Sequence, residues 1–279
     1  MKLIYRLAIA AALLASMAFA QPKPKSQKEV DALMAIQSAP ECTAPGVPNP
    51  CGPDARIASV ESLLTKFADT EFKSWALFIA TASAQQKNDF EKMVIYGERT
   101  LEADPKNFQV MIMMASGLAS KTREFDLDRE EKLGRATKFA QGALDVLKTA
   151  AKPNPQLTDE LWAAGKKDSE AEAHSALGQI AVVRKKYDVA IQEYKQAVDG
   201  AANPDPATVV RLANAYNMSG KPDDAIAMLD KVNTMPEVHP QIKAAAAGER
   251  NASVKLKGAG AKPAATPAPS AAPAQVPVK

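Results

Sequence analysis

Acid–base catalysis at neutral pH is most often carried out by histidine, and this sequence holds two, His174 and His239. A Ser-His-Asp or Cys-His site needs a histidine as its general base. His174 lies at a helix-packing position, and His239 lies in a turn between Val238 and Pro240. These surroundings favour structural roles for both side chains. The sequence therefore predicts no catalytic site and a protein that is not an enzyme.

Motifs for phosphate or metal binding are incomplete. Gly220-Lys221 lacks the earlier glycine of a phosphate-binding loop, and Pro222 stands where that loop needs Ser or Thr. Met111 and Met114, with Met113 between them, could supply soft copper ligands. However, Met111 and Met114 lie three apart on one helix face, where methionine ordinarily fills irregular gaps in a core. We expect no cofactor and no bound metal.

The first twenty residues have the pattern of a secretory signal peptide. Lys2 and Arg6 supply positive charge, an apolar run extends over 7–14, and a small-x-small cleavage site occupies 18–20. The apolar run is shorter than the roughly 20 residues of a membrane-spanning helix. We expect cleavage after residue 20 and export to the periplasm or cell envelope, with no membrane-spanning segment in the mature form. An uncleaved N-terminal anchor is the alternative.

Export gives a meaning to the two cysteines, Cys42 and Cys51, which bracket eight residues that include three prolines. Two cysteines at short spacing in an oxidising compartment predict a disulfide. Two free thiols are one alternative. A zinc site is another, although two cysteines supply half of its four ligands. We expect a Cys42–Cys51 disulfide that closes a local loop within an N-terminal segment, 21–53, which also carries a short helix over 27–37.

The C-terminal end, 252–279, is dominated by Ala, Pro, Gly and Lys and has no apolar period. Such a composition cannot offset the entropy of ordering, so we expect a disordered tail. Its four lysines have no acidic residue near them, and weak contact with an anionic envelope polymer is one role open to it. Without the tail and the signal peptide, the net charge of +3 becomes slightly negative. That balance argues against nucleic-acid binding.

Between these ends, 54–251 reads as a series of helices separated by Pro, Gly, Asn and Asp. Two stretches repeat one pattern about 35 residues apart. The first contains Leu177-Gly178, Ala190, Tyr194 and Ala197, and the second contains Leu212-Ala213, Tyr216, Ala225, Leu229 and Val232. The pattern resembles the tetratricopeptide repeat, a helix–turn–helix unit of about 34 residues. Its small residues allow close approach, and we expect Gly178 to face Ala190.

The resemblance implies an all-α, tetratricopeptide-like superhelix of helical hairpins, or α-solenoid, because one hairpin cannot bury its apolar face alone. Two interruptions are expected, a loop of about nine extra residues over 121–130 and a longer one over 152–167 with a short helix near 158–164. A last helix over 240–251 would cap the stack.

In the family, fixed positions of each first helix line a concave groove. Among the positions carried over, the candidates for partner binding are Trp75, Phe78, Gln85, Ile112, Gln179, Asn214 and Asn217, with Arg211 beside them. Amides can bond a peptide backbone while apolar groups offer pockets. The alternative for Phe78, Ile112 and Val210 is that they pack against neighbouring helices. We therefore expect an exported, non-enzymatic scaffold that binds a protein or peptide partner. The alternative is an enzyme-like or small-ligand-binding protein that uses 152–167 as a lid, for which Trp162 is the supporting residue.

Overall fold

The computed structural model describes residues 22–40, 51–154 and 156–260 of the 279-residue chain. Within these residues the secondary structure is eleven helices and no strand, which confirms the all-α prediction. The expected signal peptide, Cys42 and the end of the tail lie outside the described residues. Export and the disulfide therefore stay predictions.

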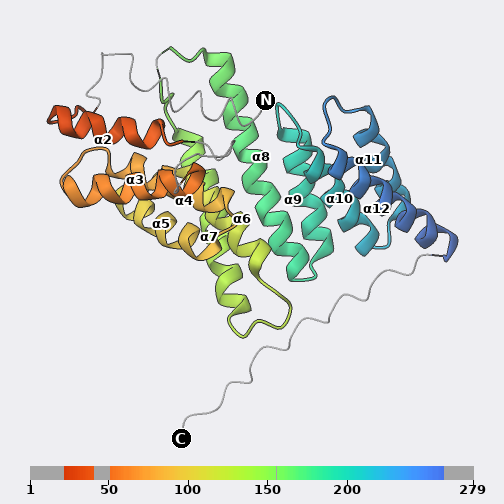
Figure 1. Ribbon diagram of the computed structural model, residues 1–279. Coiled ribbons are helices and arrows are strands. Elements are labelled where there is room, and N and C mark those ends of the chain that lie inside the picture. The colour runs from red at the N-terminus through yellow and green to blue at the C-terminus, as the bar shows by residue number, and fades with distance from the viewer. Residues whose placement is uncertain (1–21, 41–50, 155, 261–279) are drawn as a thin grey trace, which may run out of the picture.

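Most of the helices pair into antiparallel hairpins that stand side by side along the chain (Figure 1). Two N-terminal helices precede four hairpins, and one helix follows them. In order, they are α2 (Gln27–Gln37), α3 (Gly52–Lys66), α4 (Lys73–Gln86), α5 (Phe90–Ala103), α6 (Phe108–Lys121), α7 (Arg129–Thr149), α8 (Asp159–Val183), α9 (Tyr187–Gly200), α10 (Pro206–Met218), α11 (Pro222–Thr234) and α12 (Pro240–Gly258).

Three of the four hairpins use the same turn. Each of these three turns is a three-residue connection whose middle residue has a positive φ. The value is 57° at Asn88, 59° at Lys185 and 73° at Gly220. In each case the next backbone N–H donates to a carbonyl five residues earlier, at 2.8–2.9 Å. This is the hydrogen bond of a Schellman ending, which satisfies carbonyls that a helix terminus leaves unpaired. The α6–α7 connection departs from it and uses a longer loop instead.

The first two hairpins are packed through a reciprocal exchange between α5 and α6. A Cβ added at Gly97 of α5 would lie 2.5 Å from Met114 Sδ of α6, and a Cβ added at Gly117 of α6 would lie 2.4 Å from Met93 Cε of α5. Both methionines are buried, at 3% exposure or less. Each glycine is therefore the hole that receives a methionine from the facing helix, which gives these methionines a packing role.

In the α8–α9 hairpin, the prediction that Gly178 faces Ala190 was wrong. The closest atoms to a Cβ added at Gly178 belong to the Tyr194 ring, at 2.7 Å, and not to Ala190. Ala190 is fully buried beside this contact in the same core cluster. The large ring reaches the glycine because it projects across the interface, whereas an alanine one turn earlier is too short. Burial raises the pKa of the Tyr194 phenol to about 12.

Two helices are longer than expected. The separate short helix near 158–164 is instead the start of α8, which runs unbroken over 25 residues. The last helix does not stop at 251, and the disordered tail does not begin at 252, because α12 continues to Gly258. Its added turns are held from outside the helix: Ser253 is fully buried against Asn217, and Lys257 pairs with Asp223 at 2.5 Å. Composition alone does not reveal such tertiary contacts.

The glycine contacts predict opposite effects for two substitutions in the same helix. Gly178→Ala should destabilise the fold by about 1–3 kcal/mol, since the new Cβ overlaps the buried Tyr194 ring. Gly165→Ala should stabilise it by up to about 1 kcal/mol, because no atom lies within 4 Å and alanine favours a helix. Chemical denaturation of both variants measures the difference. Equal effects on the free energy of unfolding would contradict this packing.

Candidate protein-binding surface

The first helices of the four hairpins, α4, α6, α8 and α10, carry all eight predicted groove positions. We call the surface made by these positions, together with Gln109 and Ser120 of α6, the first-helix face. The structure divides its members by burial. Gln85 and Arg211 are exposed, whereas Gln179, Trp75 and Phe78 are half-buried, the last two against the N-terminal core cluster.

Ile112 does not belong to an accessible surface. It is 5% exposed and packs with Ala143 of α7 and Ala173 of α8. The prediction that it offers a binding pocket is therefore corrected, because the neighbouring hairpin already covers its side chain. The polar positions near it, Gln109 and Ser120 of α6, remain exposed.

Asn214 and Asn217 are also occupied, by α12. Both amide Nδ2 groups donate to one carboxylate oxygen, Glu249 Oε1, at 3.1 Å and 2.7 Å. Asn217 Nδ2 also donates to Ser253 Oγ at 2.8 Å, and Asn217 is 9% exposed. These two asparagines thus bind the terminal helix of their own chain. The expectation that they are free for a partner was wrong for this arrangement.

The α12 contacts predict a stability effect. Glu249→Ala should destabilise the fold by about 1–3 kcal/mol, because the half-buried Asn214 amide loses its partner and Asn217 loses one of two. Glu102→Ala, at an exposed position of α5, is the control and should change stability by less than about 0.5 kcal/mol. Thermal and denaturant unfolding measure both. A neutral Glu249→Ala would show that α12 is not held through this carboxylate.

Arg211 lies near the α12 contact but is directed toward the start of its own helix. Its Nη1 atom is 3.4 Å from Thr208 Oγ1 and 3.9 Å from Asp205 Oδ2, and its side chain is about half exposed. Thr208 Oγ1 in turn lies 3.2 Å from Ser175 Oγ of α8, so this contact links two neighbouring first helices. Such an exposed ion pair is weak and leaves the guanidinium able to bind another group.

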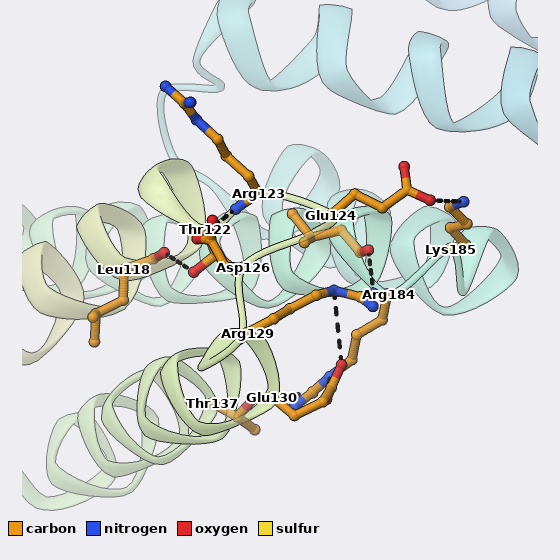
Figure 2. Close-up of polar contacts among 11 residues, drawn as sticks. Leu118, Thr122, Arg123, Glu124, Asp126, Arg129, Glu130, Thr137, Arg184 and Lys185 are labelled. Carbon is orange, nitrogen blue, oxygen red and sulfur yellow. Dashed lines mark hydrogen bonds and ion pairs between the residues drawn. The ribbon is translucent and has the colours of Figure 1, made fainter.

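A second candidate surface is the connection over 122–128, which we call the α6–α7 loop (Figure 2). Its extra length was predicted, but its exposed apolar side chains, Phe125 and Leu127, were not recognised as candidates. Both side chains stand almost fully in solvent. The available signal was two large apolar residues placed between charges in a segment expected to connect helices.

Polar contacts hold this loop at both ends and to the next hairpin. Thr122 Oγ1 donates to Leu118 O at 2.7 Å, and the Arg123 N–H donates to Asp126 Oδ2 at 3.0 Å. Across the interface, Glu124 pairs with Lys185, which lies in the α8–α9 turn (Figure 2). The loop is therefore tied to the neighbouring repeat by its own charged side chains.

The start of α7 adds two further ties to the end of α8. Arg129 Nη2 donates to Val183 O at 2.8 Å, and Glu130 Oε2 accepts from Arg184 Nε at 3.1 Å. Lys132 Nζ lies 2.9 Å from Asp128 Oδ1. This ion pair compensates the charge of the carboxylate at the end of the loop. Most charges around the apolar pair are thus neutralised within the molecule.

Asp126 lies at the centre of this arrangement. The backbone N–H of Arg123 is the main cause that lowers the pKa of its carboxyl, local desolvation opposes this, and Lys132 adds to the lowering. The contribution of the charged carboxylate to stability is therefore present above the ordinary pKa of 3.8. It is lost as the pH falls through the lower value of the folded state.

NMR titration of the Asp126 carboxyl measures its pKa and the share of the lowering that comes from Lys132. The midpoint for Asp126 should lie below 3.8 in the folded protein. Lys132→Ala should raise that midpoint without restoring the ordinary value, since the hydrogen bond from Arg123 remains. A midpoint at the ordinary value in the unsubstituted protein would show that the Asp126 contact does not form.

A cavity of about 550 Å³ lies between α7, α8 and α9. Its lining residues carry both signs of charge: Gln141, Leu144, Asp145, Lys148, Lys167, Glu170, Ala171, His174, Gln196 and Gly200. His174 Nδ1 lies 2.8 Å from Glu193 Oε2, which gives this histidine a structural partner. The lid proposed over 152–167 is not a separate flap, because 159–167 belongs to the continuous helix α8.

No group of three or more His, Cys, Asp or Glu in the described residues is placed to hold a metal ion. Among the helices of residues 22–40, 51–154 and 156–260, none is both long enough and apolar enough to cross a membrane.

Comparison with known proteins bears on the hairpins directly. Residues 183–247, from the end of α8 into α12, match the family model of the tetratricopeptide repeat. This match supports membership of the tetratricopeptide repeat family for that part of the chain. Among solved structures, the chain is similar to a thermophilic tetratricopeptide repeat protein from Thermus thermophilus, with a TM-score of 0.53 and 16% sequence identity. The similarity covers 71% of this chain and 90% of that chain. Among curated proteins, none matches.

The family match covers α9 and the α10–α11 pair, which hold the later part of the repeated sequence pattern. The structural similarity covers most of the chain. At 16% sequence identity, it shows a shared fold and nothing more. This fold is typical of protein–protein interaction scaffolds, so protein partners are the expected ligands.

Proposed function

We propose that this tetratricopeptide protein is an exported, non-enzymatic scaffold whose first-helix face forms a groove for a protein or peptide partner. The observation that carries the proposal is the state of that face over α4 and α6. Gln85 of α4 and Gln109 and Ser120 of α6 are exposed there, and Trp75 and Phe78 of α4 are half-buried. Exposed amides and hydroxyls can bond a peptide backbone, and the flanking aromatic groups can receive apolar side chains.

The C-terminal part of the face has a different role in this proposal. Over α10, helix α12 covers Asn214 and Asn217, so a partner would contact Arg211 at the boundary between the open and the covered part. Arginine is enriched among residues that dominate binding energy. The groove would then run from Gln85 to Arg211 and end at α12.

The proposal is tested by capture of a partner on the full mature chain from the envelope fraction of the source cells. Gln85→Ala combined with Arg211→Ala should weaken capture at least about fivefold, because both groups are exposed and available for binding. Melting should be unchanged, since neither side chain is in the core. Gln192→Ala combined with Lys195→Ala, at exposed positions of α9, is the matched control.

Normal capture by the Gln85 and Arg211 variant, or equal loss in the α9 control, would reject the groove. The same preparation tests export: the intact mass of the mature chain should begin at Gln21 and show one Cys42–Cys51 bridge until a reductant is added. A mass that retains the first twenty residues would reject the exported form.

A second candidate, binding of a small polar ligand, is favoured by the cavity between α7, α8 and α9. Lys148 and Lys167 could contact an anionic group, and Glu170 a cationic one. Specific binding of a zwitterionic ligand that is lost in Glu170→Gln, with capture of proteins absent, would favour this function over the scaffold.

A further inference from the structure

The α6–α7 loop presents two apolar side chains that the fold itself does not use. Phe125 is 89% exposed and Leu127 is 107% exposed, the highest values among the exposed large hydrophobic residues of the described chain. In Figure 1 the loop projects at the lower edge of the stack, beyond the α8–α9 turn. Large apolar groups in such a position are a feature of interaction sites.

The loop is built to hold these two side chains outward. Asp126, which lies between them, turns its carboxylate back to the Arg123 N–H at 3.0 Å, while the backbone N–H of Asp126 donates to Arg123 O at 3.3 Å. The Arg129 N–H then donates to Asp126 O at 3.1 Å. This closed turn is fixed to the next repeat through Glu124 and Lys185. Phe125 and Leu127 are thus presented on an ordered support.

The loop is also continuous with the first-helix face. Ser120, an exposed position at the end of α6, lies two residues before Thr122. On the next first helix, α8, the carbonyl of Val183 accepts from Arg129 at the other end of the loop. A segment that lies along α6 and α8 would therefore meet the loop at the edge of the groove.

We propose that the α6–α7 loop is a second docking element, which inserts Phe125 and Leu127 into an apolar pocket of the protein that occupies the first-helix face. This inference rests on the proposed function, because it assumes a protein partner in the groove. The loop would add projecting apolar anchors to a groove whose exposed side chains are polar. Since most neighbouring charges are already paired within the chain, this contact should depend little on salt.

A lipid surface fits the observations less well. Four carboxylates near the tip, at Glu124, Asp126, Asp128 and Glu130, are compensated by bases of the same molecule, and no strong net positive charge remains to attract anionic lipid. Two side chains bury less apolar area than a single myristoyl chain, which itself gives marginal and reversible attachment.

A second copy of this chain fits less well for a similar reason. The two side chains together offer on the order of a few hundred Å² of apolar surface, whereas a stable interface needs roughly 800 Å² from each partner. A protein already bound along the first-helix face would supply the remaining area, and the loop would need to add only its anchors.

The test uses the full mature chain in the source cells with a photoreactive residue at one position. Phe125→p-benzoylphenylalanine should form an adduct with a partner protein, and the cross-linked peptide of that partner should be apolar. Gln85→p-benzoylphenylalanine, in the groove, should give an adduct with the same protein. Adding Leu127→Ser should abolish the adduct at 125 and leave the one at 85.

Affinity for the identified partner gives the quantitative measurement. Phe125→Ser combined with Leu127→Ser should weaken binding at least about tenfold, with unchanged melting and little dependence on salt. Leu161→Ser, at a side chain of α8 that is 56% exposed, is the matched control and should bind normally.

The outcomes separate this inference from the proposed function. An adduct at 85 without one at 125 would overturn the loop inference and leave the groove intact. At position 125, an adduct with lipid alone, an adduct with a second copy of the chain, or no adduct would each overturn it. An adduct at 125 with a protein that does not cross-link at 85 would overturn the shared binding surface.

Discussion

Close approach of helices through glycine is the constraint on which this structure depends. Gly97 receives Met114, Gly117 receives Met93, and Gly178 receives the Tyr194 ring, with each added Cβ placed at 2.7 Å or less from the facing side chain. These contacts fix how far apart α5 and α6 stand between two hairpins, and α8 and α9 within one hairpin. Because each repeat contacts its neighbours, these spacings help to set the positions of the first helices. The surface available to a partner is a consequence of this packing.

That surface is not uniform along the chain. Over α4 and α6, polar groups such as Gln85 and Gln109 remain exposed, whereas over α10 the carboxylate of Glu249 accepts hydrogen bonds from the amides of Asn214 and Asn217 beneath α12. One chain thus contains both an open and a covered part of the first-helix face. The α6–α7 loop lies at the edge of the open part and is held there by the α8–α9 turn. The loop is therefore held in place by contacts with the neighbouring repeat.

The repeat architecture could be predicted from the sequence because small and large residues recur at fixed spacing, as at Gly178 and Tyr194. The helix over 27–37 and the extra length between α6 and α7 were predicted for similarly local reasons. Pairings across helices could not be predicted. Gly178 meets Tyr194 instead of Ala190, and α12 extends to Gly258 because Ser253 and Lys257 find partners far away in the chain. Asn217 was assigned to the open surface because its hydrogen bonds to α12 leave no signal in a repeat pattern.

Hydrogen–deuterium exchange of the full chain, with and without the captured partner, tests the central claim most directly. If this chain is a scaffold that binds through its first-helix face, slowed exchange on binding should be confined to α4, α6, α8 and the edge of α10 near Arg211, together with the α6–α7 loop. Exchange in α5, α7, α9 and α11 should be unchanged. Protection confined to these second helices, or to α12 alone, would contradict the account.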